Sequence, residues 1–296
     1  MASPHPLSAA ALFSLKDYVA VGIAQTLAAN GAKVYITGRR VDVLETSARV
    51  HGAKEKLGPL GGQIVPLAMD ITSKDSIRSA LAEISGKETY VNVLVNNAGL
   101  WTGRTEAKAQ DGPEAFSETM FAQNKEEYEK AFDVNCTSQF FVTAAFLPLL
   151  AKAASGPTGK IGTVINNSSV TGFTRMSHGN QYPYNISKAA FSHLTRQLAH
   201  DLSHENMNIR VNGIAFGYFQ SEMTTGPANE ENESTDTAGY EKLVELLESY
   251  GAPRPKRPGT PQEVATAVLM LVANEFVWGT VMLVDGGLAL TVASDM

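Results

Sequence analysis

The chain has 296 residues, with 30 acidic and 24 basic side chains and a formal net charge of −6, which argues against nucleic acid as its main partner. Hydrophobic residues make up 44% of the chain, enough for a globular protein with a large core, and we expect one domain over residues 1–296. The single cysteine, Cys136, excludes an intramolecular disulfide, and no stretch approaches 18 uninterrupted apolar residues, so we expect a cytoplasmic protein without a membrane span.

Short apolar segments rich in β-branched residues alternate with longer segments of helical spacing. In chain order, strands are expected at residues 18–21, 33–37, 63–68, 91–97, 162–169, 208–215 and 280–285. Helices are expected in the alanine-rich stretch that ends at Asn30-Gly31 and at residues 40–57, 74–85, 188–205 and 260–274. The last of these begins with a capping box formed by Thr260 and Glu263. This alternation predicts an α/β fold, with a parallel sheet covered by helices on both faces.

Two stretches, residues 101–125 and 217–259, interrupt the alternation. The first is polar and contains glycines, and the second holds an acidic segment, "ANEENESTDTAG", followed by an amphipathic helix, "YEKLVELLESYG". In an open α/β sheet, ligands bind where the carboxyl ends of the strands meet long loops, so we expect both insertions to border a pocket. The alternative is surface decoration, with a disordered acidic tip.

The strongest chemical signal is "YNISK", residues 184–188. Tyr184 and Lys188 are four residues apart and share one face of a helix. A phenol has an ordinary pKa of about 10, and an ammonium group beside it stabilises the phenolate and lowers that pKa. Such a tyrosine can protonate an alkoxide or remove a proton from an alcohol. Taken alone, the same pair also fits a solvated helix face.

Small or polar residues follow several of the expected strands. Ser169 ends one strand and can hydrogen-bond a substrate oxygen, and "LVNNAG" (94–99) ends another with small residues that allow a flat ligand to approach the backbone. Asn135, in "FDVNCTSQFF", falls within a helical pattern. An amide among apolar neighbours is more often a satisfied core group than a functional one.

The segments "NNAG", "SSVTG", "YNISK", "RVNGIAFG" and "VDGG" occur in the order and approximate spacing found in the short-chain dehydrogenase/reductase family, which the chain resembles over nearly its whole length, about residues 15–287. The resemblance implies one Rossmann-like domain with a doubly wound, seven-stranded parallel sheet. It also implies NAD(P)-dependent interconversion of a ketone and an alcohol, and commonly a homodimer or homotetramer. No metal is expected.

Position by position, the resemblance makes Tyr184 the general acid/base and Lys188 the group that lowers its pKa and holds the nicotinamide ribose. Ser169 would orient the carbonyl, and Asn135 would support a water relay to the lysine. Ser168 competes with Ser169 for the serine role. We prefer Ser169 because it directly precedes "VTG", as in the family's register.

The same resemblance identifies expected cofactor contacts. Arg39 and Arg40 follow the second strand, where relatives that prefer NAD carry an acidic residue, and two arginines there favour a 2′-phosphate and hence NADP(H). The alternative is two surface arginines at the start of a helix. Phe216 stands where the family usually has a proline. The other expected contacts are Asp70, Ile71, Asn97, Ala98, Gly99 and Gly217, together with Tyr184 and Lys188.

The first strand departs from the family pattern, in which a threonine-glycine-x-x-x-glycine-x-glycine turn wraps the pyrophosphate. Here Gly22 is the only glycine between strand and helix, so roughly ten residues are missing relative to that pattern. The sequence could be an incomplete version of a normal enzyme, an enzyme that binds its cofactor weakly without the turn, or a degenerate relative. We predict an NADPH-dependent oxidoreductase, with a cofactor-free binding or oligomer-partner protein as the alternative.

The sequence does not name the substrate. Aromatic residues in the two insertions permit a bulky apolar ketone, although aromatics in such loops more often pack beneath them. These residues are Trp101, Phe116, Phe121, Tyr218, Phe219 and Tyr250.

Overall fold

The computed structural model describes residues 5–105, 107–251 and 256–295. Its centre is a sheet of seven strands: β1 (Val19–Val21), β2 (Lys33–Gly38), β3 (Gln63–Ala68), β4 (Val93–Asn96), β5 (Gly162–Ser169), β6 (Ile209–Phe216) and β7 (Val281–Val284). The strand order is β3-β2-β1-β4-β5-β6-β7, and every pairing is parallel. The order reverses between β1 and β4, which is the switch point of a doubly wound sheet. The predicted α/β fold with seven parallel strands is confirmed.

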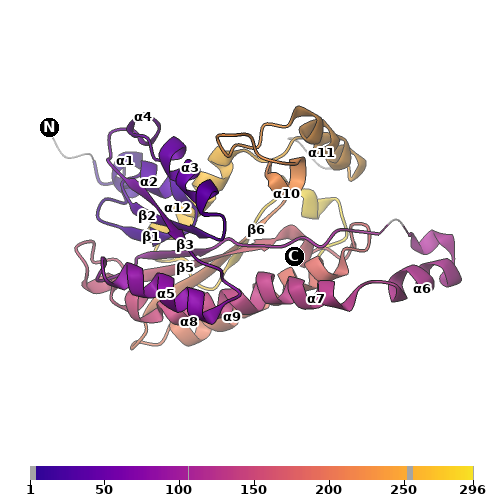
Figure 1. Cartoon of the computed structure of the whole chain (residues 1–296), viewed down its shortest axis with the longest axis horizontal. Coiled ribbons are helices and arrows are strands. Elements are labelled where there is room, and N and C mark those ends of the chain that lie inside the picture. The colour runs from indigo at the N-terminus through magenta and orange to yellow at the C-terminus, as the bar shows by residue number, and fades with distance from the viewer. Residues whose placement is uncertain (1–4, 106, 252–255, 296) are drawn as a thin grey trace.

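Helices cover both faces of this sheet (Figure 1). They are α1 (Ala9–Leu12), α2 (Ala24–Ala29), α3 (Val41–His51), α4 (Lys54–Leu57), α5 (Lys74–Ser85), α6 (Pro113–Phe121), α7 (Lys125–Phe132), α8 (Ser138–Ala151), α9 (Tyr182–Leu202), α10 (Glu222–Thr225), α11 (Thr237–Ser249) and α12 (Pro261–Ala273). One apolar core lies between the sheet and α5, α8 and α9, and a second lies between the sheet and α2 and α12. The strands between these cores are buried on both faces, which explains their continuous apolar sequences.

The boundaries of the strands follow the sequence more closely than those of the helices. The strands β3 and β5 have the bounds expected for them, and β1 is one residue shorter than expected. The helix expected over 40–57 is divided into α3 and α4 at Gly52, where a Cβ atom would lie 2.2 Å from the Ala48 carbonyl oxygen. The helix expected from residue 188 begins earlier, at Tyr182. Pro183 lies in its first turn, where a proline is compatible with a helix.

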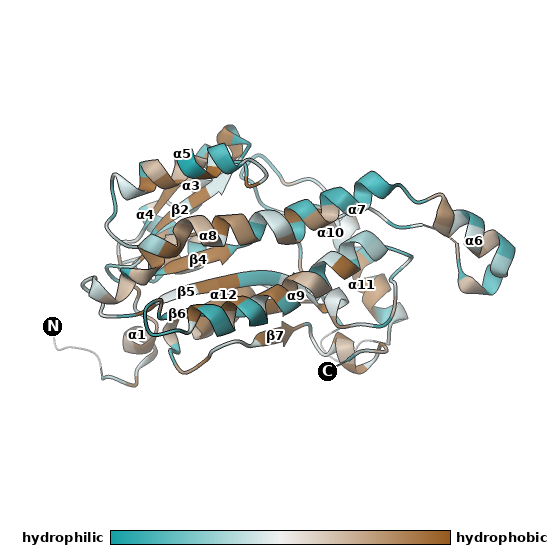
Figure 2. Cartoon of the chain, turned by 90° about the horizontal axis from the view of Figure 1, so that it is seen from below, coloured by the Kyte–Doolittle hydropathy of each residue, from teal (hydrophilic) through white to brown (hydrophobic). Residues whose placement is uncertain are grey.

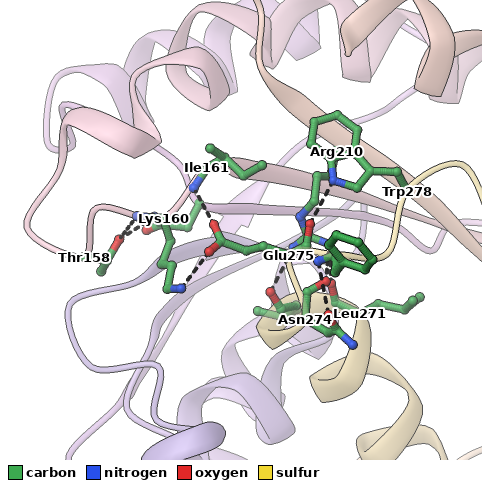
Figure 3. A network of polar contacts seen from close by, with 11 residues as sticks. Thr158, Lys160, Ile161, Arg210, Leu271, Asn274, Glu275 and Trp278 are labelled. Atoms are coloured by element: carbon green, nitrogen blue, oxygen red, sulfur yellow. Dashed lines mark hydrogen bonds and ion pairs between the residues drawn. The ribbon is translucent and has the colours of Figure 1, made fainter.

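Both ends of α12 are held by polar groups. At its start, the Glu263 carboxylate accepts a 2.8 Å hydrogen bond from the Thr260 backbone N–H, so the predicted capping box is present. At its end, the buried Arg210 guanidinium donates to the Leu271 and Val272 carbonyl oxygens at 2.8 and 2.9 Å (Figure 3). These carbonyls have no partner within the helix, so Arg210 satisfies them and fastens α12 to β6.

The two insertions take different paths. Residues 101–125 contain α6, which extends away from the sheet at one end of the molecule (Figure 2). Residues 217–259 contain α10 and α11, and their acidic segment lies against α3 and α4. Asn232 donates a 2.7 Å hydrogen bond to the Ser47 hydroxyl, and Glu233 pairs with Lys56 at 3.5 Å. The acidic segment therefore packs on the body of the protein and is not a detached tip.

The helices α7 and α8 are joined by a turn of π-helix, Asp133–Thr137, into one long helical run. Of the described residues, the run Lys125–Ser155 is the one stretch long and apolar enough to cross a membrane by length and composition. Within it, 44% of the most apolar window is buried, and α8 packs on β4, β5 and α5. This packing is that of a core helix. Core helices can also be long and apolar enough to meet the criterion for a membrane span.

Candidate active site

Two of the hollows at the carboxyl ends of the strands contain expected site residues. The first, which we call the switch-point cleft, has a volume of about 620 Å³ and lies at the ends of β1 to β4. It is lined by Val21, Gly22, Ile23, Ile36, Thr37, Gly38, Arg39, Met69, Asp70, Ile71, Thr72, residues 94–100, Lys130, Asp133, Val134, Gln139 and Val142. The second, which we call the tyrosine pocket, has a volume of about 320 Å³ and lies at the ends of β5 and β6. It is lined by Trp101, Arg104, Ser169, Val170, Thr171, Gln181, Tyr184, Gly217, Tyr218, Met223, Thr224, Lys242, Leu243 and Leu246.

The helix α9 brings Tyr184 and Lys188 to one place, as their spacing predicts. The Lys188 Nζ atom lies 5.8 Å from the centre of the Tyr184 ring and donates a 2.7 Å hydrogen bond to the Asn167 carbonyl oxygen. Lys188 is 3% exposed, and this burial lowers its pKa to about 8. The amine therefore sits behind the tyrosine with its own position fixed by the end of β5.

Tyr184 and Ser169 both line the tyrosine pocket, and the Ser169 hydroxyl oxygen accepts hydrogen bonds from the Thr171 N–H and hydroxyl at 3.3 and 3.0 Å. Protein atoms surround Tyr184 closely enough that burial raises its pKa, and the neighbouring Ser169 hydroxyl acts in the opposite direction. We expected Lys188 to lower the pKa of Tyr184. In this structure burial has the larger effect, so the phenol is held in its protonated form at neutral pH.

The two serines that compete for the same role point to different places. The Ser168 hydroxyl lies 2.5 Å from the Ser192 hydroxyl and donates to the Lys188 carbonyl oxygen at 3.1 Å, so it is occupied by α9. Successive side chains of a strand alternate between its two faces. Ser169 therefore turns away from these partners and lines the tyrosine pocket, as expected.

Asn135 lies in the π-helical turn between α7 and α8, a local distortion often found at functional sites. Its Oδ1 atom accepts from the Leu100 N–H at 2.7 Å, and its Nδ2 atom donates to the Leu100 carbonyl at 2.9 Å and to the Ser187 hydroxyl at 3.0 Å. These contacts make Asn135 a satisfied buried amide that pins the chain after β4 to α9. They leave its part in a water relay as a prediction.

Most of the expected cofactor contacts lie together. Six of them line the switch-point cleft: Arg39, Asp70, Ile71, Asn97, Ala98 and Gly99. Asp70 accepts hydrogen bonds from the Thr72 backbone and hydroxyl at 3.0 and 2.8 Å, which lower its pKa and keep it ionised. A Cβ atom at Gly99 would lie 3.6 Å from the Lys188 Nζ atom, so this end of the cleft reaches α9.

The other four expected cofactor contacts, Tyr184 and Lys188 on α9 together with Arg40 and Gly217, do not line the cleft. Arg40 is exposed and pairs with Glu222 of α10 at 2.9 Å, because the insertion after β6 folds over the start of α3. Gly217 lines the tyrosine pocket instead, where a Cβ atom would lie 2.7 Å from the Cα atom of Asp285.

Only Gly22 and Ile23 separate β1 from α2. Gly22 has a φ of +127°, and a Cβ atom there would lie 2.5 Å from the Val95 Cβ atom. The connection therefore packs tightly on β4, and both of its residues line the cleft.

Sequence reasoning missed several side chains of the tyrosine pocket. Gln181, Met223 and Leu246 line it alongside the two cations Arg104 and Lys242. Of the aromatic residues in the insertions, only Trp101 and Tyr218 line it, while Phe121 is 94% exposed on α6. The position of the insertions after strands was the one signal that pointed to these residues.

The family resemblance and the fold agree with comparisons to known proteins. The family model described as "Enoyl-(Acyl carrier protein) reductase" matches residues 16–289. The chain belongs to the short-chain dehydrogenase/reductase family. Among curated relatives, the short-chain dehydrogenase/reductase PhomF of Diaporthe leptostromiformis is 33% identical over 302 aligned positions, which cover 95% of this chain and 94% of PhomF.

A second similar protein of this family is the rhamnolipid biosynthesis 3-oxoacyl-[acyl-carrier-protein] reductase of Pseudomonas aeruginosa, which is 32% identical over 90% of this chain and 91% of its own length. Among solved structures, the RhlG/NADP active-site complex of Pseudomonas aeruginosa superposes with a TM-score of 0.73 at 28% identity, covering 96% of this chain and 99% of RhlG. A complex of 7α-hydroxysteroid dehydrogenase with NADH superposes with a TM-score of 0.69 at 25% identity, covering 96% of this chain and 97% of that enzyme. The chain is therefore an oxidoreductase of this family with a Rossmann-like fold.

Proposed function

We propose that this oxidoreductase interconverts a ketone and an alcohol with NADP(H) as its hydride carrier. The observation that carries the proposal is the inner wall of the tyrosine pocket. There Tyr184 and Ser169 line the same pocket, with the buried amine of Lys188 5.8 Å from the centre of the Tyr184 ring. A carbonyl oxygen that enters the pocket meets two hydroxyl donors at the end of β5.

The chain supplies the proton chemistry of the reaction. Ser169 hydrogen-bonds the carbonyl oxygen and orients it, and Tyr184 gives its proton to that oxygen as negative charge develops there. The positive charge of Lys188 stabilises the phenolate that remains, and in the oxidative direction the phenolate removes the proton from the alcohol. Bound NADPH would supply the hydride to the carbonyl carbon.

The residues of the switch-point cleft fit a dinucleotide unevenly. At the ends of β2 and β3, Arg39, Asp70 and Ile71 offer polar and apolar contacts for adenosine, and the small residues around Gly99 leave room beside Lys188 for a ribose. From the connection after β1, only Gly22 and Ile23 face the part of the cleft where a pyrophosphate would lie. We therefore expect binding to depend more on the two ends of the cofactor than on its centre.

The preference for NADP over NAD is part of the proposal. It is supported by Arg39 in the cleft, by Arg40 beside it, and by the absence of an acidic residue in "TGRR" at the end of β2. The RhlG structure is an NADP complex, whereas the 7α-hydroxysteroid dehydrogenase complex holds NADH, so the family accommodates both. We further propose one domain, a cytoplasmic location, a homodimer or homotetramer, and no nucleic-acid or membrane partner.

The role of Tyr184 is tested by Tyr184→Phe. The variant keeps the ring and its packing but has no proton to give, so we expect ketone reduction with NADPH to slow by about 10² to 10⁴. The thermal midpoint and the dissociation constant of NADPH should stay close to those of the parent protein. The matched control is Tyr182→Phe, at the start of the same helix, which should keep full turnover. A Tyr184→Phe variant that reduces the ketone at the parental rate would refute the assignment.

The alternative of a cofactor-free binding protein is not favoured by the comparisons or by the geometry. Every residue expected to act on the substrate oxygen, namely Ser169, Tyr184 and Lys188, is present and brought together.

A further inference from the structure

The tyrosine pocket has a buried inner wall and an exposed rim. Ser169 and Leu243 are 7% and 4% exposed, whereas Trp101 is 37% exposed. Arg104 and Lys242 are also exposed, one from the loop after β4 and the other from α11. A ligand whose oxygen reaches Ser169 therefore presents its other end to the rim.

The rim carries two positive charges and, among the described lining residues, no carboxylate. Over the part of the chain that the structure describes, neither Arg104 nor Lys242 forms an ion pair within 4.0 Å. The whole chain has a net charge of −6, so this concentration of positive charge is local. The charge of Arg104 also acts on Tyr218, which lines the pocket. Burial raises the pKa of Tyr218, and the positive charge of Arg104 opposes that increase.

The arginine and the aromatic wall are held in place by their neighbours. A Cβ atom at Gly179 would lie 3.1 Å from the Arg104 Cδ atom, so the stem of this side chain rests on the loop after β5. The guanidinium carbon lies 5.8 Å from the centre of the Trp101 ring. The Trp101 indole N–H in turn donates a 3.0 Å hydrogen bond to Gln181. The Trp101 ring therefore offers a flat apolar surface beside the Arg104 guanidinium in the same pocket as Ser169 and Tyr184.

We propose that the substrate class is aryl ketones that carry a carboxylate, an inference that rests on the proposed reductase function. The ketone oxygen would lie against Ser169 and Tyr184, the ring against Trp101, and the carboxylate between Arg104 and Lys242. Guanidinium and ammonium groups both favour a carboxylate partner. A volume of about 320 Å³ is at the small end of ligand pockets and suits a molecule of one or two rings.

The test compares two probes that differ only in charge, 4-acetylbenzoate and 4-acetylbenzamide. The chain has two tryptophans, so in a Trp278→Phe background Trp101 is the sole reporter and its quenching measures binding without any chemistry. We expect the acid to bind about tenfold more tightly than the amide. Arg104→Gln and Lys242→Gln should each weaken acid binding about three- to fivefold, the scale of an exposed ion pair, and leave amide binding unchanged.

The matched control is Lys152→Gln, which removes the same charge at the far end of α8 and should change neither affinity. Equal binding of acid and amide would overturn the proposal, and so would Arg104→Gln and Lys242→Gln variants that both keep the full affinity for the acid. If Arg104→Gln fails to fold, Lys242→Gln on the surface of α11 still tests whether the rim cations bind the carboxylate. Preferential binding of the acid with no NADPH-dependent reduction would contradict the proposed function and support this inference. If both probes bind and are reduced equally well, the result would support the proposed function and contradict this inference.

Discussion

Ser168 and Ser169 show how one position along a strand decides what a hydroxyl can do. Both residues end β5, both are buried, and they are adjacent in the chain. The Ser168 hydroxyl forms hydrogen bonds with the Ser192 hydroxyl and the Lys188 carbonyl oxygen, whereas Ser169 faces Tyr184. Strand alternation predicts that only one of them can reach the pocket, but not which one. The choice of Ser169 rests on its place before "VTG", and in the structure it is Ser169 that lines the tyrosine pocket.

His178 is a buried titratable group close to the tyrosine pocket. Its ring nitrogens lie 3.0 Å from the Thr174 hydroxyl and 3.3 Å from the Tyr250 hydroxyl, and the Tyr250 ring stacks with that of Tyr218 on the pocket wall. Burial, assisted by the positive charge of Arg104, lowers the pKa of His178 from 6.5 to about 4. The folded protein therefore holds this imidazole neutral over a pH range in which the unfolded chain protonates it.

The free energy of unfolding should consequently fall as the pH drops from 6.5 to 4. Above that window His178 is neutral in both states and has no effect on the pH dependence. Within the window the unfolded state binds more protons, so up to about 3 kcal/mol is lost by pH 4, and below it the contribution is constant. Urea unfolding at pH 7.5, 5.5 and 4.5 would measure this loss.

The control for His178 is His178→Asn. The residue has a φ of +54°, which asparagine tolerates better than most residues. The variant cannot titrate, so its stability should change less between pH 7.5 and 4.5 than that of the parent protein. Parallel pH profiles for the two proteins would contradict the prediction.

At the scale of elements, the segment between β6 and α11 ties the tyrosine pocket to the adenosine side of the cleft. It crosses α3 and α4 through four polar contacts: Arg40 with Glu222 at 2.9 Å, Ser47 with Asn232 at 2.7 Å, His51 with the Glu231 carbonyl at 3.2 Å, and Lys56 with Glu233 at 3.5 Å. We call this segment, residues 217–236, the strap. A change in the strap therefore affects both the tyrosine pocket and the switch-point cleft. Arg40, one of the two arginines proposed for the 2′-phosphate, already has a carboxylate partner within the chain.

Glu222→Gln should consequently raise the affinity for NADPH. The 2′-phosphate no longer has to replace a carboxylate on Arg40 or approach a negative charge, so we expect binding about two- to fivefold tighter, in keeping with an exposed ion pair. NADH has no 2′-phosphate, and its affinity should stay the same. Titration of both cofactors by fluorescence measures the ratio.

The control is Glu233→Gln, which breaks the equivalent pair with Lys56 in the same strap but away from the end of β2. It should leave the NADPH-to-NADH ratio unchanged. Equal changes for both cofactors in Glu222→Gln would point to a loosened strap and against a direct role for Arg40.

The sequence predicts elements well where they are regular and poorly where tertiary contacts define them. The strands are apolar β-branched runs, and the capping box at Thr260 is a local signal, so both could be read directly. The path of the strap and the placement of Arg104 and Lys242 depend on contacts between insertions more than a hundred residues apart, which no periodicity encodes. Pro113 at the first position of α6 is a local signal for the start of that helix.

At the scale of the whole molecule, the alternation of strands and helices was enough to predict the sheet, and most of the expected site residues line two pockets at its carboxyl edge. What the alternation could not predict is how a shortened first connection would be accommodated. In the structure the chain passes from β1 to α2 through Gly22 and Ile23, and Gly22 packs directly on Val95. The full strand order and a cleft at the switch point are both present with this short connection.

This arrangement predicts that the whole protein is stabilised by NADPH. A ligand at 100 times its dissociation constant raises the free energy of unfolding by about 2.7 kcal/mol, which for a domain of this size corresponds to a rise of several degrees in the thermal midpoint. NADH should give a smaller rise at the same concentration. Adenosine 2′,5′-bisphosphate, which carries the 2′-phosphate but no nicotinamide, should retain part of the NADPH effect, because Arg39 and Asp70 lie at the adenosine end of the cleft. If neither dinucleotide shifts the midpoint at millimolar concentration, the short connection between β1 and α2 has abolished cofactor binding. The protein would then be the cofactor-free binding or oligomer-partner protein of the alternative hypothesis, against which the presence of Ser169, Tyr184 and Lys188 argues.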